Sequence, residues 1–247
     1  MKKMMLMVTL LMGMVSASYA QIGITVGADA FNSYIWRGGK LGKVAVQPSI
    51  DYLSPYGIGV NVWTSFAGEF LPTVTSEVDY TIYYSYAFES FTLSAGYINY
   101  VSNAGLPFDE ETDVTADFKG NVSEVNVGIK FPSILLAPSL KVYKNIAASD
   151  NNVAYEKAMY IEAAAGYDFA IAEGYTLSSS LTLGLGNETY TKDGDLGVCN
   201  VFPKLALPLT FSGVSVTPSV GYIYNPSAFT GADDSFLVAG VGVYYAF

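Results

Sequence analysis

The chain has 247 residues, of which 22 are acidic and 12 basic, giving a formal net charge of −10, with one cysteine and no histidine. An acidic chain repels a phosphate backbone, so nucleic acid is not an expected partner. The lack of histidine excludes the usual Cys/His zinc sites and any catalytic arrangement with histidine as the base, and a single cysteine cannot form an internal disulfide. We therefore expect no enzyme activity, no metal site and no cofactor.

The chain begins with the pattern of a secretory signal peptide. Lys2 and Lys3 are followed by an apolar segment at residues 4–15 and then by small residues before a cleavage site. The apolar segment is too short for a spanning helix, which needs about 20 residues. We predict that residues 1–20 are a signal peptide and residues 21–247 the exported domain. Loss of the two lysines changes the net charge from −10 to −12.

Apolar and polar residues alternate along most of the remaining chain. In the segment EVDYTIYYSYAF, residues 77–88, every second side chain from Val78 onward is apolar or aromatic. A period of two is that of a β-strand with one apolar face. The same pattern predicts about twelve strands, give or take two. They lie at residues 22–34, 44–53, 58–66, 77–88, 91–100, 122–131, 134–144, 157–169, 175–186, 199–211, 214–224 and 235–247.

The connections between these strands alternate in length. Short ones are expected at 54–57, 89–90, 132–133, 170–174 and 212–213, and long ones at 35–43, 67–76, 101–121, 145–156, 187–198 and 225–234. Short turns on one rim and longer loops on the other are typical of outer-membrane barrels. An even number of strands returns both termini to the short-turn, periplasmic rim.

A soluble β-sandwich would also alternate, but its outer face would be about 25–35% charged. Here the second face of each strand carries mostly small neutral residues, and aromatic residues gather near strand ends, as they do at bilayer surfaces. We therefore predict an all-β fold, a closed antiparallel transmembrane β-barrel in the bacterial outer membrane, in contact with lipid and lipopolysaccharide. Ile82 and Leu183 should face lipid, whereas Thr81 and Thr182 should face the interior.

The last predicted strand ends at Phe247, the final residue of the sequence. A terminal aromatic residue after alternating apolar residues is similar to the assembly signal of bacterial outer-membrane proteins. We expect this strand to seal against the first strand and to be recognised by the barrel-assembly machinery.

Several short motifs stand near the start of the exported domain. They are Ser33-Tyr34-Ile35-Trp36-Arg37-Gly38, Ala45-Val46-Gln47-Pro48, Asp51-Tyr52, Trp63-Thr64-Ser65 and Glu77-Val78-Asp79-Tyr80. This set resembles the TorF-type porins, in which an Arg-Gly element precedes strands that carry Gln, Trp-x-Ser and Glu-x-Asp. Those proteins usually begin the second strand with Pro-Ala, whereas Val44-Ala45 stands here and the proline is at position 48. The resemblance implies a porin-like barrel and no particular substrate.

Alternation places seven acidic and three basic side chains on the inner faces of the strands. They are Asp29, Asp51, Glu77, Asp79, Glu124, Lys130, Lys141, Glu162, Asp168 and Lys204. All except Asp51 and Asp168 are our candidate channel-lining residues. A cation-favouring entrance is one interpretation, because rings of carboxylates select cations. An ion-pair network that braces a narrow barrel is the other.

Two local arrangements follow from the same pattern. Arg37, in the first long loop, either reaches inward to the acids or stays solvated. If Lys144 opposes Lys157 across the hairpin of strands 134–144 and 157–169, then Glu162 is a diagonal neighbour of Lys141 and the two should form a contact.

The function that these observations favour is a porin-like channel for small polar solutes or ions, with a preference for cations. The alternative is a non-conducting structural or interaction barrel whose extracellular loops bind a partner.

Overall fold

The computed structural model describes residues 23–67, 77–102, 120–149, 155–226 and 235–247, and these are almost entirely β-structure. The predicted signal peptide at residues 1–20 lies outside the described residues. Within the described part of the chain, no helix combines the length and the apolar character needed to cross a bilayer.

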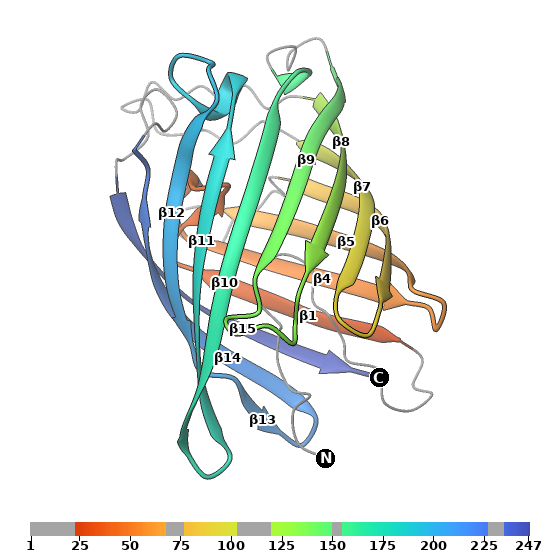
Figure 1. Cartoon of the computed structure of the whole chain (residues 1–247), viewed down its shortest axis with the longest axis vertical. Coiled ribbons are helices and arrows are strands. Elements are labelled where there is room, and N and C mark those ends of the chain that lie inside the picture. Colours follow the sequence, from red (N-terminus) through yellow and green to blue (C-terminus); the bar gives the residue numbers. More distant parts are fainter. Residues whose placement is uncertain (1–22, 68–76, 103–119, 150–154, 227–234) are drawn as a thin grey trace.

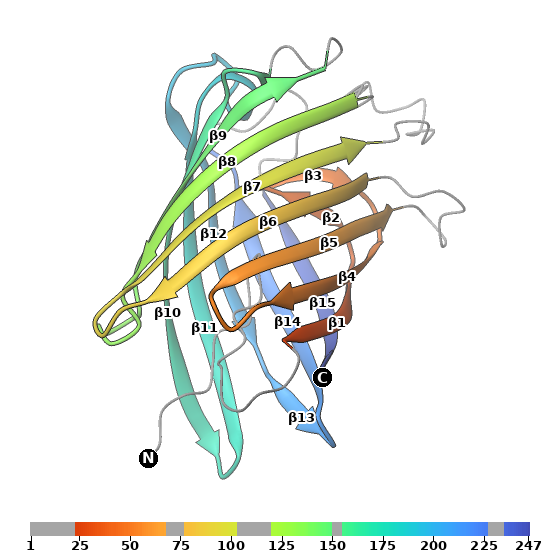
Figure 2. The same cartoon turned by 90° about the vertical axis from the view of Figure 1, so that its right-hand side faces the viewer.

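Twelve long strands form a single closed antiparallel barrel (Figures 1 and 2). In order around the barrel they are β1 (Ile24–Phe31), β4 (Ala45–Leu53), β5 (Ile58–Ala67), β6 (Glu77–Ala87), β7 (Thr92–Ser102), β8 (Gly120–Lys130), β9 (Ser139–Ala148), β10 (Met159–Ala172), β11 (Tyr175–Gly186), β12 (Gly197–Ala206), β14 (Val214–Tyr224) and β15 (Ser235–Ala246). The fold class and the number of spanning strands predicted from the sequence are confirmed.

The barrel closes between its first and last strands. β1 pairs with β4 on one side and with β15 on the other, from Thr25 opposite Ala246 to Phe31 opposite Gly240. Beyond the end of β15, the Phe247 amide donates a 3.0 Å hydrogen bond to the Ile24 carbonyl. Closure leaves no open sheet edge along this seam, which a bilayer requires because unpaired backbone groups cost several kcal/mol each in hydrocarbon.

The two faces of the strands differ as the alternation predicts. At the middle of β6, the side chain of Ile82 is 52% exposed on the outer surface, whereas Thr81 is 6% exposed on the inner face. On β11, Thr182 is buried and its neighbour Leu183 is partly exposed. Since an apolar outer surface of this extent is stable only in a non-aqueous environment, the barrel has the surface of a membrane protein.

Two predicted strand boundaries are wrong. Residues 134–138 belong to a turn, and β9 begins only at Ser139; Leu136 and Ala137 adopt left-handed conformations with φ of 67° and 40°. The apolar run in this turn resembles a strand but lies exposed at the rim. The predicted strand 199–211 is interrupted after Ala206, because Pro208 cannot donate to a ladder. The short β13 (Leu209–Phe211) then pairs with β14.

Candidate functional site: a hairpin inside the barrel

The first long connection forms a hairpin that turns into the barrel. Its strands are β2 (Tyr34–Trp36) and β3 (Gly39–Gly42), which pair with each other and with no strand of the barrel wall. Both views place it within the outline of the barrel, near the long-loop rim (Figures 1 and 2). The sequence pattern predicts a strand that ends at residue 34 and a loop at residues 35–43, and no hairpin.

The base of the hairpin packs against the wall formed by β4 and β5. Tyr34 is buried with Ala45 and Ala67, and its ring centroid lies 5.9 Å from that of Trp63. The Tyr34 hydroxyl donates a hydrogen bond to the carboxylate of Glu77 on β6. The two small alanines allow the hairpin backbone to approach the wall closely.

The tip of the hairpin is a tight two-residue turn at Arg37 and Gly38, with φ of 49° and 84°. Positive φ at both central residues is the type I′ pattern, which glycine adopts without cost and arginine does not. Two asparagines outside the hairpin hold this turn: Asn200 on β12 donates to the Arg37 carbonyl at 2.9 Å, and Asn225, directly after β14, donates to the Gly38 carbonyl at 2.7 Å. The strained conformation is therefore stabilised by groups outside the hairpin.

The Arg37 side chain forms an ion pair in the interior. Its Nη2 lies 2.8 Å from Oε1 and 2.7 Å from Oε2 of Glu124 on β8, and its Nη1 donates to the hydroxyl of Tyr190. The Tyr100 hydroxyl donates a further hydrogen bond of 2.9 Å to Glu124. The arginine and glutamate side chains are only 5% and 0% exposed. Of the two alternatives for Arg37, the structure has the inward one.

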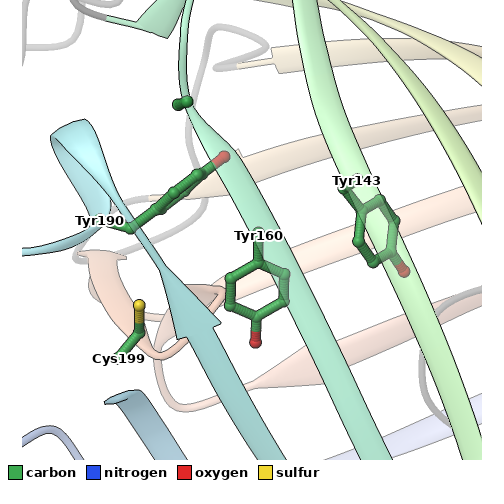
Figure 3. Packing of buried hydrophobic residues seen from close by; sticks show 5 residues of the cluster. Tyr143, Tyr160, Tyr190 and Cys199 are labelled. Carbon is green, nitrogen blue, oxygen red and sulfur yellow. The ribbon is translucent and has the colours of Figure 1, made fainter. Parts of the chain in front are cut away.

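Four aromatic rings surround the guanidinium. Its central carbon lies 4.8, 4.4, 4.8 and 5.2 Å from the ring centroids of Trp36, Tyr143, Tyr160 and Tyr190. Figure 3 shows the last three rings and Cys199, which come from β9, β10, β12 and the short helix η2 (Glu188–Tyr190). Each cation–π contact contributes about 0.5–2 kcal/mol, depending on how completely water is excluded from it.

The hairpin crosses the barrel interior. It starts between β1 and β4, and its tip contacts β8, β9, β10 and β12. In the twelve-strand order, β9 is the sixth strand from β1 in either direction, so base and tip touch opposite walls. A structure that bridges the interior in this way narrows any passage on the long-loop side.

The protonation states at the tip favour this ion pair. Burial lowers the pKa of Arg37, but the Glu124 carboxylate and the hydroxyls of Tyr190, Tyr100 and Tyr143 together outweigh burial and raise that pKa well above its ordinary value. Burial also raises the pKa of Tyr190, so its phenol stays neutral and can accept the hydrogen bond from Arg37. Arg37 therefore keeps its charge, and Tyr190 its proton, over the neutral pH range.

The predicted channel-lining acids near the long-loop rim lie beside the hairpin. Glu77 and Asp79 lie on the same face of β6, Glu77 accepts a hydrogen bond from Tyr34, and Glu124 holds Arg37. In the ranges that the structure describes, no group of three or more Asp, Glu, Cys or His side chains has a geometry suited to a metal ion.

The remaining inward charges fall into pairs of opposite sign along the wall. Asp29 interacts electrostatically with Lys204, Glu162 with Lys141, and Asp168 with Lys130. Asp51 accepts a 2.8 Å hydrogen bond from Tyr83. Together with the Arg37–Glu124 ion pair, four of the seven predicted inner acids therefore interact with a cation.

The predicted register of β9 and β10 is wrong, although the predicted neighbours are correct. Lys144 opposes Met159 rather than Lys157, which brings Glu162 directly opposite Lys141 instead of diagonal to it. The Lys141 ammonium lies 5.0 Å from the ring centroid of Tyr143. The shift arises because the connection is two residues longer than the prediction assumed, and Lys144 reaches back to the carbonyl of Lys157.

Sequence reasoning missed most partners of Arg37. The residues that hold the tip are spread over four elements and the position directly after β14: Tyr143, Tyr160, Tyr190, Asn200 and Asn225. The usable signal was the motif set that resembles TorF-type porins, since it supplies Tyr34, Trp36, Arg37, Gly38, Trp63 and Glu77. These motif residues, separated in sequence, meet at the hairpin.

Solved structures with a similar fold include outer-membrane porins. The chain is 13% identical to the KdgM porin, with a TM-score of 0.56 over 90% of this chain and 99% of that one; KdgM in complex with disordered oligogalacturonate gives the same values. The NanC porin is 10% identical, with a TM-score of 0.53 over 91% of this chain and all of the other. No family model and no curated protein matches the chain.

These likenesses define the class as a twelve-strand porin-like β-barrel. At such low identity they establish the fold alone. The TorF-type resemblance has no matching family model to support it, and we treat it as a proposal.

Proposed function

We propose that the chain is an outer-membrane channel for small polar solutes or ions, narrowed on its long-loop side by the β2–β3 hairpin. The observation that carries the proposal is the hairpin itself. It crosses the polar interior of the barrel and is held there by the buried ion pair between Arg37 at its tip and Glu124 on the wall. Porins commonly restrict solute size and charge with groups fixed inside the pore, because selectivity depends on pore width and lining charge.

The same proposal covers the location and the assembly of the protein. A signal peptide at residues 1–20 would direct export, and the exposed aromatic residues of the barrel would contact lipid and lipopolysaccharide. The strand ending at Phe247 would be the segment recognised by the barrel-assembly machinery. The motif set at residues 33–80 would make the chain a TorF-type porin.

The lining charges favour cations over anions in this proposal. The acids that face no lysine or arginine in the pairs described above are Glu77, Asp79 and Asp51, of which Glu77 and Asp51 accept hydrogen bonds from tyrosines. The KdgM structure holds oligogalacturonate, an acidic saccharide. On the inner face of the wall strands seven acids stand against three lysines, so the wall would repel such a polyanion and an acidic saccharide is a poor candidate solute here.

Solute passage is tested by swelling of proteoliposomes in isotonic solutions of small polar solutes. The proposal predicts swelling that slows as solute size increases, and faster swelling for cationic than for anionic solutes of equal size. Swelling no faster than that of protein-free liposomes for every solute would contradict it.

Removing the two mouth acids should reduce the cation preference. In Glu77→Gln/Asp79→Asn the Tyr34 hydroxyl keeps an acceptor, so the hairpin stays docked while at least one negative charge is lost. The reversal potential across a salt gradient should then shift toward that of an unselective pore. Glu173→Gln, a change at the exposed β10–β11 turn, serves as control and should leave the potential unchanged. An unaltered potential in the double variant would mean that these acids only brace the wall.

The second candidate is a barrel that does not conduct and presents its loops to a partner. The crossing of the interior by the hairpin is the observation that favours it, since a docked hairpin together with the ring cluster around Arg37 fills part of the lumen.

A further inference from the structure

Four aromatic rings on the inner wall lie close against glycines, and we call this set the aromatic–glycine band. Each ring faces a glycine on the neighbouring strand. The pairs are Phe31 with Gly240, Tyr83 with Gly59, Phe202 with Gly221, and Tyr244 with Gly27. A Cβ atom added to the glycine would stand 2.1–2.5 Å from the ring in every pair. Only glycine therefore allows these rings to lie against the wall instead of projecting across the interior.

The two tyrosines of the band are also fixed at their hydroxyl ends. Tyr83 donates a 2.8 Å hydrogen bond to Asp51, and Tyr244 donates to Asp29. Because the ring is held by a glycine and the hydroxyl by a carboxylate, neither ring can rotate freely. All four rings of the band are only partly buried. The result is a set of fixed aromatic surfaces that solvent can reach.

The band extends over seven of the twelve strands of the wall. Its rings and glycines belong to β12, β14, β15, β1, β5 and β6, which with β4 are consecutive around the barrel. Tyr83 and Tyr244 lie toward the short-turn rim, while Phe31 is the last residue of β1 at the opposite end. The rings are therefore staggered in depth along a path through the barrel.

Hydrogen-bonding groups of both kinds accompany the rings. The Lys204 ammonium lies 5.8 Å from the ring centroid of Phe31 and interacts electrostatically with Asp29. Each carboxylate offers about four lone-pair positions, of which a tyrosine hydroxyl occupies one. A ligand moving along the band would thus meet apolar ring surfaces beside carboxylate acceptors, with the Lys204 ammonium, on a side chain only 9% exposed, near Phe31.

From this arrangement we infer that the aromatic–glycine band binds neutral saccharides during passage through the barrel. A pyranose ring has a flat C–H face that stacks on an aromatic ring, and its hydroxyls both donate to carboxylates and accept from ammonium groups. Sites of this kind combine apolar faces with a few fixed polar groups. The inference rests on the proposed channel function and adds the class of solute to it.

The same groups disfavour two other ligands. An acidic saccharide would be repelled by Asp29 and Asp51. An organic cation could use the ring faces, but Lys204 beside Phe31 would repel it within the band.

The test is current blocking of the purified full-length protein in planar bilayers, with maltohexaose as the neutral probe and hexagalacturonate as the acidic one. We expect maltohexaose to interrupt the open-channel current at lower concentration than hexagalacturonate. Tyr83→Leu/Tyr244→Leu, which removes two ring faces, should raise the half-blocking concentration of maltohexaose roughly tenfold. Tyr84→Leu/Tyr245→Leu removes the adjacent outward-facing rings and serves as the matched control. Its half-blocking concentration of maltohexaose should equal that of the unmodified protein.

The outcomes separate the two levels of the proposal. A channel that conducts but is not blocked by maltohexaose, that is blocked more strongly by hexagalacturonate, or whose blocking is unchanged in Tyr83→Leu/Tyr244→Leu would overturn the saccharide inference and leave the channel function standing. If the leucine variant folds poorly, Gly59→Ala, which displaces the Tyr83 ring, should weaken blocking in its place, and unchanged blocking there would overturn the inference. Absence of any current would overturn the channel function, and the inference with it.

Discussion

Replacing Ile82 by arginine should lower the free energy of unfolding by about 2–4 kcal/mol. Ile82 is 52% exposed at the middle of β6 on the outer surface, where a charged side chain would meet hydrocarbon. The matched change is Asn61→Arg on the neighbouring β5. Asn61 is only partly buried on the inner face and hydrogen-bonds Asp51, so an arginine there would find water and a carboxylate.

Reversible denaturant unfolding of both variants in lipid vesicles measures this difference. The free energy of unfolding of Asn61→Arg should lie within about 1 kcal/mol of that of the unmodified protein, because an exposed ion pair usually changes stability by no more than this. Equal losses at the two positions would mean that the interior is dry or that the inner and outer faces have been assigned wrongly.

Replacing Arg37 by alanine should release the hairpin without unfolding the barrel. The change removes the ion pair with Glu124, the hydrogen bond to Tyr190 and the contacts with the rings around them. Breaking a buried ion pair typically costs about 3–5 kcal/mol. Because the strand pairing of the wall does not involve the hairpin, we expect this loss to appear mainly as undocking.

The single cysteine reports on that undocking. Cys199 is 2% exposed and packs beside Tyr190 in the cluster that receives the tip. In Arg37→Ala its reaction with a water-soluble thiol reagent should be at least about tenfold faster, since each 1.4 kcal/mol lost from docking raises the undocked fraction tenfold. Lys192→Ala removes an exposed charge near the same rim and should leave the rate unchanged. An unchanged rate in Arg37→Ala would show that Arg37 does not hold the tip.

The barrel could be predicted from the sequence because its cause is local. The period-two alternation at residues 77–88 is a property of each strand alone, and the burial of Thr81 beside the exposed Ile82 follows from it directly. Opposite-charge neighbours such as Lys141 and Glu162 could also be predicted, because both lie on the inner faces of adjacent strands.

The hairpin could not be predicted in the same way, because its cause is not local. The turn at Arg37 requires a left-handed conformation that Asn200 and Asn225 stabilise from 163 and 187 residues away. Nothing in the alternation distinguishes a loop that turns inward from one that extends into solvent. The register of β9 and β10 failed for a related reason, since the length of a connection fixes which residues face each other.

Single-channel recording in planar bilayers shows whether the barrel contains a passage narrowed by the docked hairpin. Phe31 and Ala45 are opposite each other in the β1–β4 pairing, so residues 33–43 can be replaced by a short turn without disturbing the wall. We expect stepwise ion currents from the unmodified protein and larger current steps from the shortened variant, because the passage is no longer narrowed. Silence of the unmodified protein, under conditions in which a known porin conducts, would contradict the proposed passage.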